Sequence, residues 1–478
     1  MKRRDDVDVD VDPGLLYPEH NISVPVDHFF NETKYEPHSN ASFNLRYWFD
    51  ATYYEPGGPV IVLQGGETDA SGRLVHLQKG IVYELSKATG GLGVILEHRY
   101  YGTSFPVDDL STENLRFLTT QQAVADQAYF AANIKFPGLE HRDLTAPGGT
   151  PYIAYGGSYA GGFVAFLRKV YPELTWGAIS SSGVTAPIYD YWQYYEPVRQ
   201  YGPPDCIANQ QKLINVLDTI LLDKNNSATR EKLKASFGLL GLTYDDDFAN
   251  LVSYGIGNFQ SKNWDPAVNS PDFDYYCGNI TSQSVLWPHT EAAASNASAL
   301  LEAAGRGNES DTLTAPLLNL IGWTNDSYVS ACDDTLDNCF GAHNASAPIY
   351  SDKSLDNYGS LSWSYQVCTE WGFIQTGSGV PKDQLPLISR LLTLDYLTLA
   401  CRYAFNITSP PDEAVIDQYG RYNISYPRLA LIGGEADPWR PVTPLASLDV
   451  PTQINETSTV SEPKILIQGA VHHWDGMC

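Results

Sequence analysis

The stretch A-Y-G-G-S-Y-A-G-G-F, from Ala154 to Phe163, is the most informative part of this sequence. An apolar run, Pro151 to Tyr155, leads into it, and residues with helical spacing continue to Tyr171. Glycines flank Ser158 on both sides, and small residues permit the sharp strand-to-helix turn that exposes a nucleophilic serine at the end of a sheet. The alternative is an ordinary glycine-rich turn before a helix, and this stretch alone leaves both interpretations open.

Short apolar runs of the kind that form buried parallel strands lie on both sides of a long central segment. They are Pro59 to Gln64, Gly93 to His98, Pro151 to Tyr155, Arg428 to Gly434 and Lys464 to Gly469. Apolar residues at helical spacing predict helices between the early strands, at Gln121 to Ile134 and at Gly161 to Tyr171. This alternation predicts a doubly wound, mostly parallel α/β sheet.

The central segment has a different composition. It is rich in Tyr, Trp and Asn, its strand signals are weak, and helical spacing appears at Gln210 to Leu222 and Asp383 to Leu399. We therefore predict an α/β core formed by residues 1–188 and 396–478, with a largely helical insertion at residues 189–395.

Charge and cysteine content exclude several classes of partner. The chain has 56 acidic and 30 basic side chains, a net charge of −26, so we expect no nucleic-acid partner. It has no apolar window long enough to span a membrane. The seven cysteines lack the CxxC spacing of metal sites, and we predict neither a metal nor an organic cofactor. Cys332 and Cys339 are close enough for a local disulfide, and the odd count leaves Cys478 as the expected unpaired thiol.

Asn-X-Ser/Thr triplets point to the secretory pathway, where N-glycans are added and disulfides persist. The twelve acceptors are Asn21, Asn31, Asn40, Asn225, Asn279, Asn296, Asn308, Asn325, Asn344, Asn406, Asn423 and Asn455. The first residues, M-K-R-R-D-D-V, lack the apolar stretch of a signal peptide. We therefore expect the natural protein to extend beyond this N-terminus.

Partners for Ser158 follow the last two predicted strands. A serine hydroxyl needs a base and an orienting acid, and α/β-hydrolases supply them in the order Ser, acid, His at strand ends. The sequence G-G-E-A-D-P-W carries Asp437, and G-A-V-H-H-W-D carries His472 and His473. This order predicts a catalytic triad of Ser158, Asp437 and one of the two histidines.

An oxyanion hole would complete such a site. We expect one backbone N–H from Tyr159 and another from Gly66, in the loop that follows the first predicted strand. Glycine in this loop lets the backbone approach a substrate. A simple strand-ending turn is the alternative for Gly66.

A series of motifs resembles the prolyl carboxypeptidase and dipeptidyl peptidase II family of serine peptidases. They are G-G-S-Y-A-G-G around Ser158, E-H-R-Y-Y-G from Glu97, L-R-F-L-T-T-Q-Q-A-V-A-D from Leu115, Y-Q-V-C-T-E-W-G from Tyr365, G-G-E-A-D-P-W and H-H-W-D. The resemblance extends from about residue 24 to the C-terminus. It implies an α/β-hydrolase core, a helical domain inserted over the active site, and cleavage after proline, commonly at acidic pH.

The resemblance also implies roles for individual residues. The family pattern favours His472 over His473 as the base. Trp439 matches a position that lines the proline pocket, where a flat aromatic wall suits a pyrrolidine ring; a core aromatic is the alternative. Glu370 and Glu67 are predicted to bind substrate, for example the free ammonium of a dipeptidyl peptidase substrate, and a structural hydrogen-bond acceptor is the alternative for each.

Glu97, His98 and Arg99 end a predicted strand near the core, so we interpret them as structural, with His98 a poor rival base. The chain ends six residues after His472, whereas relatives of the family it resembles continue into a final helix, so a truncation here would remove support from the loop that carries the base.

The sequence therefore predicts a secreted, lysosomal or vacuolar serine exopeptidase that acts on peptides containing proline. Carboxypeptidase and dipeptidyl peptidase activities remain open, and so do a monomer and a homodimer. The alternatives are a prolyl endopeptidase, an esterase or lipase of the same fold, and a catalytically inactive binding protein. A lipase would need an apolar rim, whereas the insertion is polar and rich in glycosylation triplets.

Overall fold

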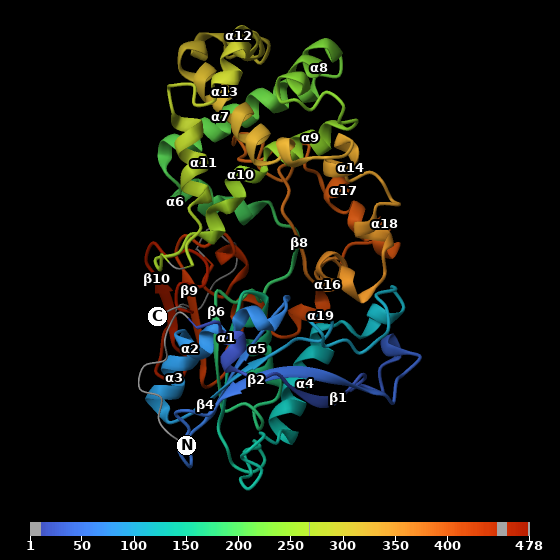
Figure 1. Ribbon diagram of the computed structural model, residues 1–478, viewed down its shortest axis with the longest axis vertical. Helices are drawn as coiled ribbons and strands as arrows, with labels where there is room; N and C mark the ends of the chain where they lie inside the picture. Colours follow the sequence, from blue (N-terminus) through green and yellow to red (C-terminus); the bar gives the residue numbers. More distant parts are fainter. Residues whose placement is uncertain (1–10, 267, 447–456, 477–478) are drawn as a thin grey trace. The chain divides into compact units, whose positions relative to one another are not determined.

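The computed structural model describes residues 11–266, 268–446 and 457–476 (Figure 1). The predicted free thiol Cys478 and the glycosylation acceptor Asn455 lie outside these residues. The chain divides into two compact units. Met1–Tyr189, Asp352–Gly372 and Ala404–Cys478 form what we call the sheet unit, and Asp190–Ser351 and Phe373–Tyr403 form the helical unit. An insertion at 189–395 that covers the active site stays a prediction.

An eight-stranded sheet lies at the centre of the described part of the sheet unit. Its strands are β1 (His20–Pro25), β2 (Ser42–Asp50), β3 (Val60–Gln64), β4 (Leu92–Leu96), β5 (Tyr152–Gly157), β6 (Gly177–Ser181), β9 (Leu429–Gly434) and β10 (Lys464–Ile467). Their order is β1-β2-β4-β3-β5-β6-β9-β10. All neighbours from β4 to β10 are parallel, whereas β2 is antiparallel to both β1 and β4. The predicted, mostly parallel sheet is confirmed.

The five predicted strands correspond to β3, β4, β5, β9 and β10, whereas β1, β2 and β6 were not predicted. Burial alternates along most of β1, so it lacks the continuous apolar run that marks a strand covered on both faces. The sequence of β6, G-A-I-S-S, is short and polar at its end.

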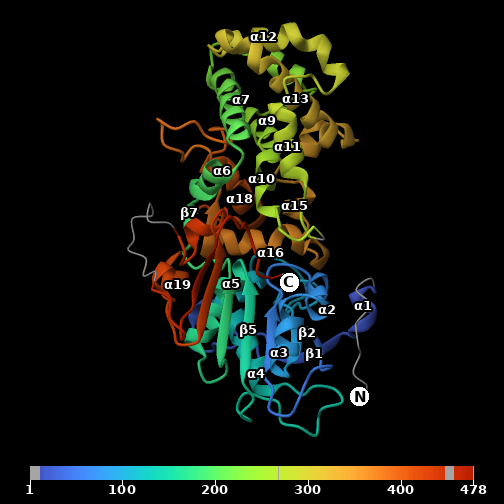
Figure 2. The ribbon, with the colours of Figure 1, turned by 90° about the vertical axis from the view of Figure 1, so that its left-hand side faces the viewer.

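Helices flank the sheet whose strand β5 leads into the predicted nucleophile (Figure 2). In chain order they are α1 (Pro13–Leu16), α2 (Val75–Gln78), α3 (Ile81–Thr89), α4 (Thr120–Asn133), α5 (Tyr159–Val170), α16 (Tyr358–Gln366) and α19 (Ala414–Asp417). Leu77 of α2 and Val82 of α3 are buried in one cluster with Leu63, Ile95 and Tyr155 of the sheet. The helix α5 packs along β5 and β6 and also contacts α4. Both predicted helices of the core, α4 and α5, are present.

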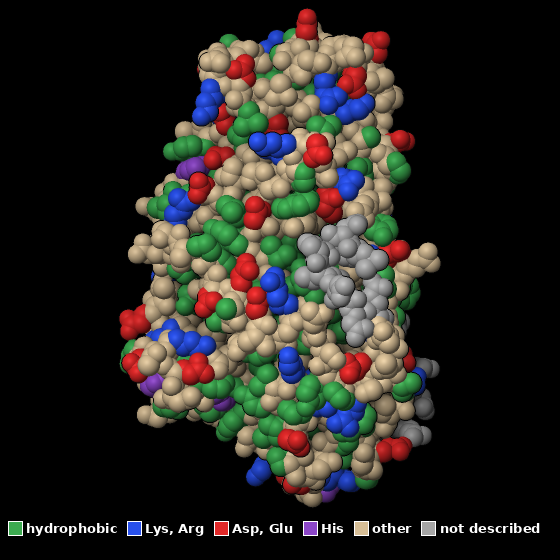
Figure 3. All heavy atoms as spheres, turned by 180° about the vertical axis from the view of Figure 1, so that it is seen from behind, with side chains coloured by type: hydrophobic (Ala, Val, Ile, Leu, Met, Phe, Trp, Pro, Cys, Tyr) green, Lys and Arg blue, Asp and Glu red, His purple; other side chains and the backbone are tan. Residues whose placement is uncertain are grey.

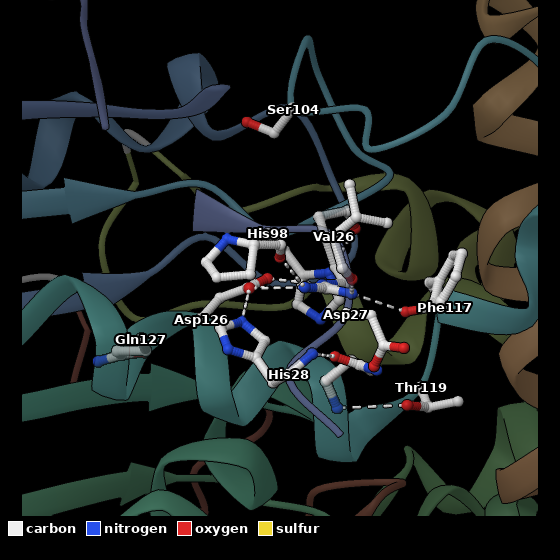
Figure 4. Close-up of polar contacts among 12 residues, drawn as sticks. Val26, Asp27, His28, His98, Ser104, Phe117, Thr119, Asp126 and Gln127 are labelled. Atoms are coloured by element: carbon white, nitrogen blue, oxygen red, sulfur yellow. Dashed lines mark hydrogen bonds and ion pairs between the residues drawn. The ribbon is translucent and has the colours of Figure 1, made fainter. Parts of the chain in front are cut away.

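A buried ion pair fixes α4 to the loop that follows β4. Arg99 donates hydrogen bonds from Nε and Nη2 to the two carboxylate oxygens of Asp126, each at 2.6 Å. Its Nη1 donates to the carbonyl oxygens of Val26 and Phe117, both at 3.0 Å. His28 points toward the same carboxylate, with Nε2 2.8 Å from Asp126 Oδ1 (Figure 4). These bonds agree with a structural role for Arg99.

The helical unit consists mainly of short helices. They are α6 (Tyr195–Tyr201), α7 (Pro204–Leu222), α8 (Ser227–Ser236), α9 (Asp245–Val252), α10 (Tyr254–Gly257), α11 (Asp272–Thr281), α12 (Ala294–Ala303), α13 (Ser310–Ser327), α14 (Leu336–Phe340), α15 (Pro348–Ser351) and α17 (Leu394–Leu397). Two short strands, β7 (Ile188–Asp190) and β8 (Gly372–Ile374), and the helix α18 (Leu399–Phe405) lie where the chain passes between the units. A disulfide joins Cys206 of α7 to Cys277 of α11, and the predicted local disulfide Cys332–Cys339 is confirmed.

The predicted helix at Asp383 to Leu399 is wrong, because helix begins only at Leu394. Pro386 cannot donate a backbone hydrogen bond within a helix. Side chains also stabilise an irregular path: Ser389 donates from Oγ to Asp218 Oδ1 at 2.5 Å, and Arg390 donates from Nη1 to the carbonyl of Val380 at 2.6 Å.

The molecular surface mixes both signs of charge. On the face drawn in Figure 3, Lys and Arg are interspersed with Asp and Glu, and the described residues form no wide basic patch there. Among the residues that the structure covers, we find no helix with the length and apolarity that a bilayer span needs.

Candidate active site

Ser158 lies at a strained turn between β5 and α5. Its φ of 57° and ψ of −123° are costly for a residue with a side chain, and such strain is concentrated at functional sites. A Cβ at Gly156 would lie 2.1 Å from the carbonyl oxygen of Ala160, and one at Gly161 would lie 2.6 Å from Cα of Gly183. Gly156 and Gly161 are therefore required by close backbone approach around a half-buried Ser158.

Asp437 and His472 form a hydrogen-bonded pair in the loops after β9 and β10. His472 Nδ1 lies 2.9 Å from Oδ2 and 3.0 Å from Oδ1 of Asp437. A carboxylate only accepts, so Nδ1 carries the proton and Nε2 presents a lone pair. Nε2 is buried and has no hydrogen-bond partner among the described residues. The pair thus offers a base whose tautomer is fixed by an acid.

His473 links this pair to the serine turn. A Cβ at Gly157 would lie 2.2 Å from Cε1 of His473, and the rings of His472 and His473 have centroids 3.9 Å apart. The His473 imidazole therefore lies beside the residue that precedes Ser158 and in contact with the ring of His472. Within the described residues no hydrogen bond joins Ser158 to His472, and such bonds are commonly long before substrate binds.

Tyr159 is the first residue of α5, where backbone N–H groups have no partner within the helix and can bind an anion. Its hydroxyl is held by buried side chains. His98 Nδ1 donates to the carbonyl of Arg99 at 2.7 Å, so Nε2 accepts from the Tyr159 hydroxyl at 2.9 Å. Gln366 donates to the same hydroxyl at 2.9 Å. Burial lowers the pKa of His98 to about 4, and the neutral ring has a structural role here.

Gly66 follows β3 and has a φ of 74°, which favours glycine. Its N–H donates to Gln64 Oε1 at 3.2 Å. This bond would have to break before the N–H could bind an oxyanion, and the role of Gly66 stays a prediction.

The three residues predicted to bind substrate differ in their surroundings. Trp439 is half-buried, and its backbone N–H donates a hydrogen bond to Asp437 Oδ1 at 2.9 Å. Glu67 is half-buried beside Gly66; burial raises the pKa of its carboxyl group. Glu370 is buried, which raises its pKa, and its Oε2 accepts from N and Oγ1 of Thr120 at 2.9 and 2.8 Å. Those bonds favour the structural alternative for Glu370, while the roles of Trp439 and Glu67 stay predictions.

Sequence reasoning gave no role to Asp475, although it ends the motif H-H-W-D. The hydroxyl of Ser181 donates to Asp475 Oδ1 at 2.5 Å, and that of Tyr155 donates to Oδ2 at 3.1 Å. Burial raises the pKa of Asp475. Its place in the motif was the available signal; its partners on β5 and β6 could be found only from the structure.

One cluster in the helical unit has ligand types that bind cations. Asp246, Asp247 and His343 each offer a ligand atom, all within 4.8 Å of one another. His343 Nε2 is 2.9 Å from Asp246 Oδ1, and Asp247 Oδ1 accepts from the Tyr396 hydroxyl at 2.8 Å. These contacts give the cluster a structural explanation, and we assign no metal to it.

Comparison with known proteins identifies the family. Residues 25–477 match the family model described as serine carboxypeptidase S28. The chain belongs to this family. The predicted resemblance to the family of prolyl carboxypeptidase and dipeptidyl peptidase II is thus confirmed, and so is the α/β-hydrolase fold, whose strand order the sheet also shows.

Individual relatives cover most of this chain. A probable extracellular serine carboxypeptidase of Arthroderma benhamiae is 48% identical over 97% of this chain and 64% of its own length. Serine protease vicPb of Bipolaris victoriae is 30% identical over 88% of this chain and 78% of its own length. The lysosomal Pro-X carboxypeptidase of Homo sapiens is 28% identical over 87% of this chain and 76% of its own length. The chain therefore spans less than two thirds of the Arthroderma protein. Among solved structures, a proline iminopeptidase of Mycobacterium smegmatis aligns over 95% of this chain and 91% of its own, with 13% identity and a TM-score of 0.35.

Proposed function

We propose that this protein is a serine exopeptidase that hydrolyses peptide bonds after proline. Ser158 is the nucleophile, His472 the general base and Asp437 the acid that orients it. The observation that carries the proposal is the hydrogen bond from His472 Nδ1 to Asp437, at the same sheet edge as the strained turn of Ser158. Family membership supports the same reaction class.

The arrangement supports acyl transfer by nucleophilic catalysis. His472 Nε2 takes the proton of the Ser158 hydroxyl as Oγ attacks the carbonyl carbon. The imidazolium that forms is stabilised by Asp437 and returns the proton to the leaving amine as the peptide bond breaks. Water then attacks the acyl-enzyme by the same proton transfers and releases the acid. The N–H groups of Tyr159 and Gly66 are the proposed donors to the oxyanion.

We assign the protein first to the carboxypeptidases, because the family description and two relatives carry that name. The proline preference draws on the name of the human relative and on Trp439, whose ring suits a pyrrolidine that packs by shape. A dipeptidyl peptidase is the second candidate, favoured by the carboxyl group of Glu67 beside Gly66, which would pair with an ammonium.

We further propose that the protein acts outside the cell or in a lysosome-like compartment. Nine of the twelve predicted glycosylation acceptors are exposed, which leaves them accessible for glycan attachment. Asn279 and Asn325 are half-buried. Relatives with extracellular and lysosomal names support the same assignment.

The test of the proposed function is Ser158→Ala. We expect turnover to fall by more than about 10³-fold and labelling by a fluorophosphonate to be lost, because the variant lacks the attacking hydroxyl. The substrates are two proline peptides, one acetylated at its N-terminus and one amidated at its C-terminus, and mass spectrometry identifies the products. A carboxypeptidase cuts the first, and a dipeptidyl peptidase cuts the second. Full activity in Ser158→Ala would refute the assignment, and a wild type that is not labelled would favour a binding protein.

A further inference from the structure

Ser181, the last residue of β6, contacts both halves of the proposed site. It is the register partner of Gly157 in β5, and its carbonyl oxygen accepts the N–H of Ser158 at 2.9 Å. Its side-chain hydroxyl donates a hydrogen bond to Asp475 Oδ1 at 2.5 Å, in the loop that carries His472. One residue therefore fixes the turn of the nucleophile through its backbone and the loop of the base through its side chain.

The second carboxylate oxygen of Asp475 is also held. The hydroxyl of Tyr155, in β5, donates to Oδ2 at 3.1 Å. Asp475 lies only three residues after His472, so a carboxylate fixed at both oxygens restricts the short loop that carries the base. Because Ser158 directly follows β5, the hydrogen bond from Tyr155 attaches the loop of His472 to the same strand that carries the nucleophile.

His473 fills the space between the loop and the serine turn. Its N–H donates to Ser182 Oγ at 3.3 Å, and its ring lies where a side chain at Gly157 would be. Ser181 gives its only proton to Asp475, so its oxygen accepts from His473 Nδ1 at 3.4 Å. The His473 ring therefore lies next to the ring of His472 and sets how closely the loop can approach Gly157.

We propose that Asp475, Ser181 and Tyr155 form a clasp that positions His472 against Ser158. They are positioning residues, since none of them reacts with the substrate. The inference rests on the proposed triad and adds which residues set the distance between the His472 imidazole and the Ser158 hydroxyl. A displacement of about 1 Å at a reacting group can cost about 10²-fold in rate, so the clasp should act mainly on kcat.

The chain provides a matched pair of variants to test the clasp. Ser181→Ala removes the hydroxyl that binds Asp475 and leaves the carbonyl that binds Ser158. Ser180→Ala is the control: it removes the preceding hydroxyl of the same strand, which is buried and has no hydrogen-bond partner among the described residues. For each variant kcat and KM on a proline peptide, the rate of fluorophosphonate labelling and the melting temperature are measured.

We expect Ser181→Ala to lower kcat and the labelling rate by about ten-fold or more while KM changes by less than about two-fold. Ser180→Ala should keep kcat and KM within about two-fold of the wild type. Ser181→Thr, which restores a hydroxyl, should recover most of kcat. If Ser181→Ala does not fold, Tyr155→Phe carries the test, because it removes one hydroxyl from the clasp and keeps the ring.

Equal kcat values for Ser181→Ala and Ser180→Ala, in folded proteins of wild-type substrate affinity, would overturn the clasp. A fall in melting temperature without a fall in kcat would also overturn it, because that is the result of a purely structural role. Neither outcome affects the proposed triad, which stands or falls with Ser158→Ala.

Discussion

At the scale of single residues, Gly157 shows why the motif around Ser158 is so poor in side chains. Its neighbour Gly156 faces backbone, whereas Gly157 faces the imidazole of His473. The motif therefore serves both the strained turn and the approach of the histidine loop. The sequence indicates the first of these, because the strand-to-helix context is visible. It does not indicate the second, which depends on a contact between residues far apart in the chain.

Gly157→Ala tests this contact. The new methyl group would lie 2.2 Å from Cε1 and 2.4 Å from Nδ1 of His473, so the ring must move and displace His472 with it. We expect kcat to fall by about 10²-fold, with a loss of about 1–3 kcal/mol in the free energy of unfolding. Steady-state kinetics and urea unfolding measure the two effects.

Gly359→Ala is the control for Gly157→Ala. Gly359 is an exposed residue of α16, and a Cβ there would meet nothing within 4 Å. We expect wild-type kcat and an unchanged or slightly higher stability, since alanine favours helix. If Gly157→Ala gives the same kinetics as Gly359→Ala, His473 does not set the position of the base.

At the scale of elements, the strands that carry chemistry are those the sequence predicts. β3, β5, β9 and β10 are apolar runs that end at glycines, and this pattern marks a parallel strand followed by a functional loop. The order of Ser158, Asp437 and His472 then follows from the topology. β6 escapes prediction because G-A-I-S-S has too little apolar character, and the clasp at Ser181 is missed with it.

The ion pair between the loop after β4 and α4 is a further feature that sequence alone leaves open. Arg99 lies in the motif E-H-R-Y-Y-G and Asp126 in the motif L-R-F-L-T-T-Q-Q-A-V-A-D, and nothing in the spacing of these motifs pairs the two residues. Both side chains are almost fully buried, and Arg99 holds the pKa of Asp126 below its usual value. A buried pair of this kind is costly to break, because the remaining charge has no water around it.

Arg99→Leu is therefore expected to lower the free energy of unfolding by about 3–5 kcal/mol, since Asp126 is left buried without the guanidinium that neutralises it. Chemical denaturation measures this loss. Arg142→Leu, at an exposed position of the same unit, should change stability by less than about 0.5 kcal/mol. Adding Asp126→Leu to Arg99→Leu should recover part of the loss. An Arg99→Leu protein as stable as the Arg142→Leu control would contradict this account.

At the scale of the whole molecule, burial shifts the pKa values of carboxyl groups and of histidines, and the two shifts have opposite effects on stability at acid pH. Burial raises the pKa of Glu370 and Asp475, so the stability they contribute is present at low pH and is lost as the pH rises through their folded pKa. Burial lowers the pKa of His98 and His76 to about 4 in each case. These histidines take up protons in the unfolded chain first, and that uptake lowers stability as the pH falls below about 6.5.

His98 allows the second effect to be isolated, because its neutral ring is fixed between Arg99 and Tyr159. Between about pH 6.5 and pH 5 its folded form resists protonation, so it should cost the wild type about 2 kcal/mol of unfolding free energy. His98→Gln removes this titration, and His141→Gln, at an exposed position, leaves it in place. Urea unfolding followed by tryptophan fluorescence at about pH 7 and about pH 5 gives the difference for each protein. We expect the pH-dependent loss to be smaller in His98→Gln than in the wild type and unchanged in His141→Gln. Equal losses in all three proteins would mean that His98 accepts a proton in the folded state, which the burial of the ring and the hydrogen bond that its Nε2 accepts from the Tyr159 hydroxyl argue against.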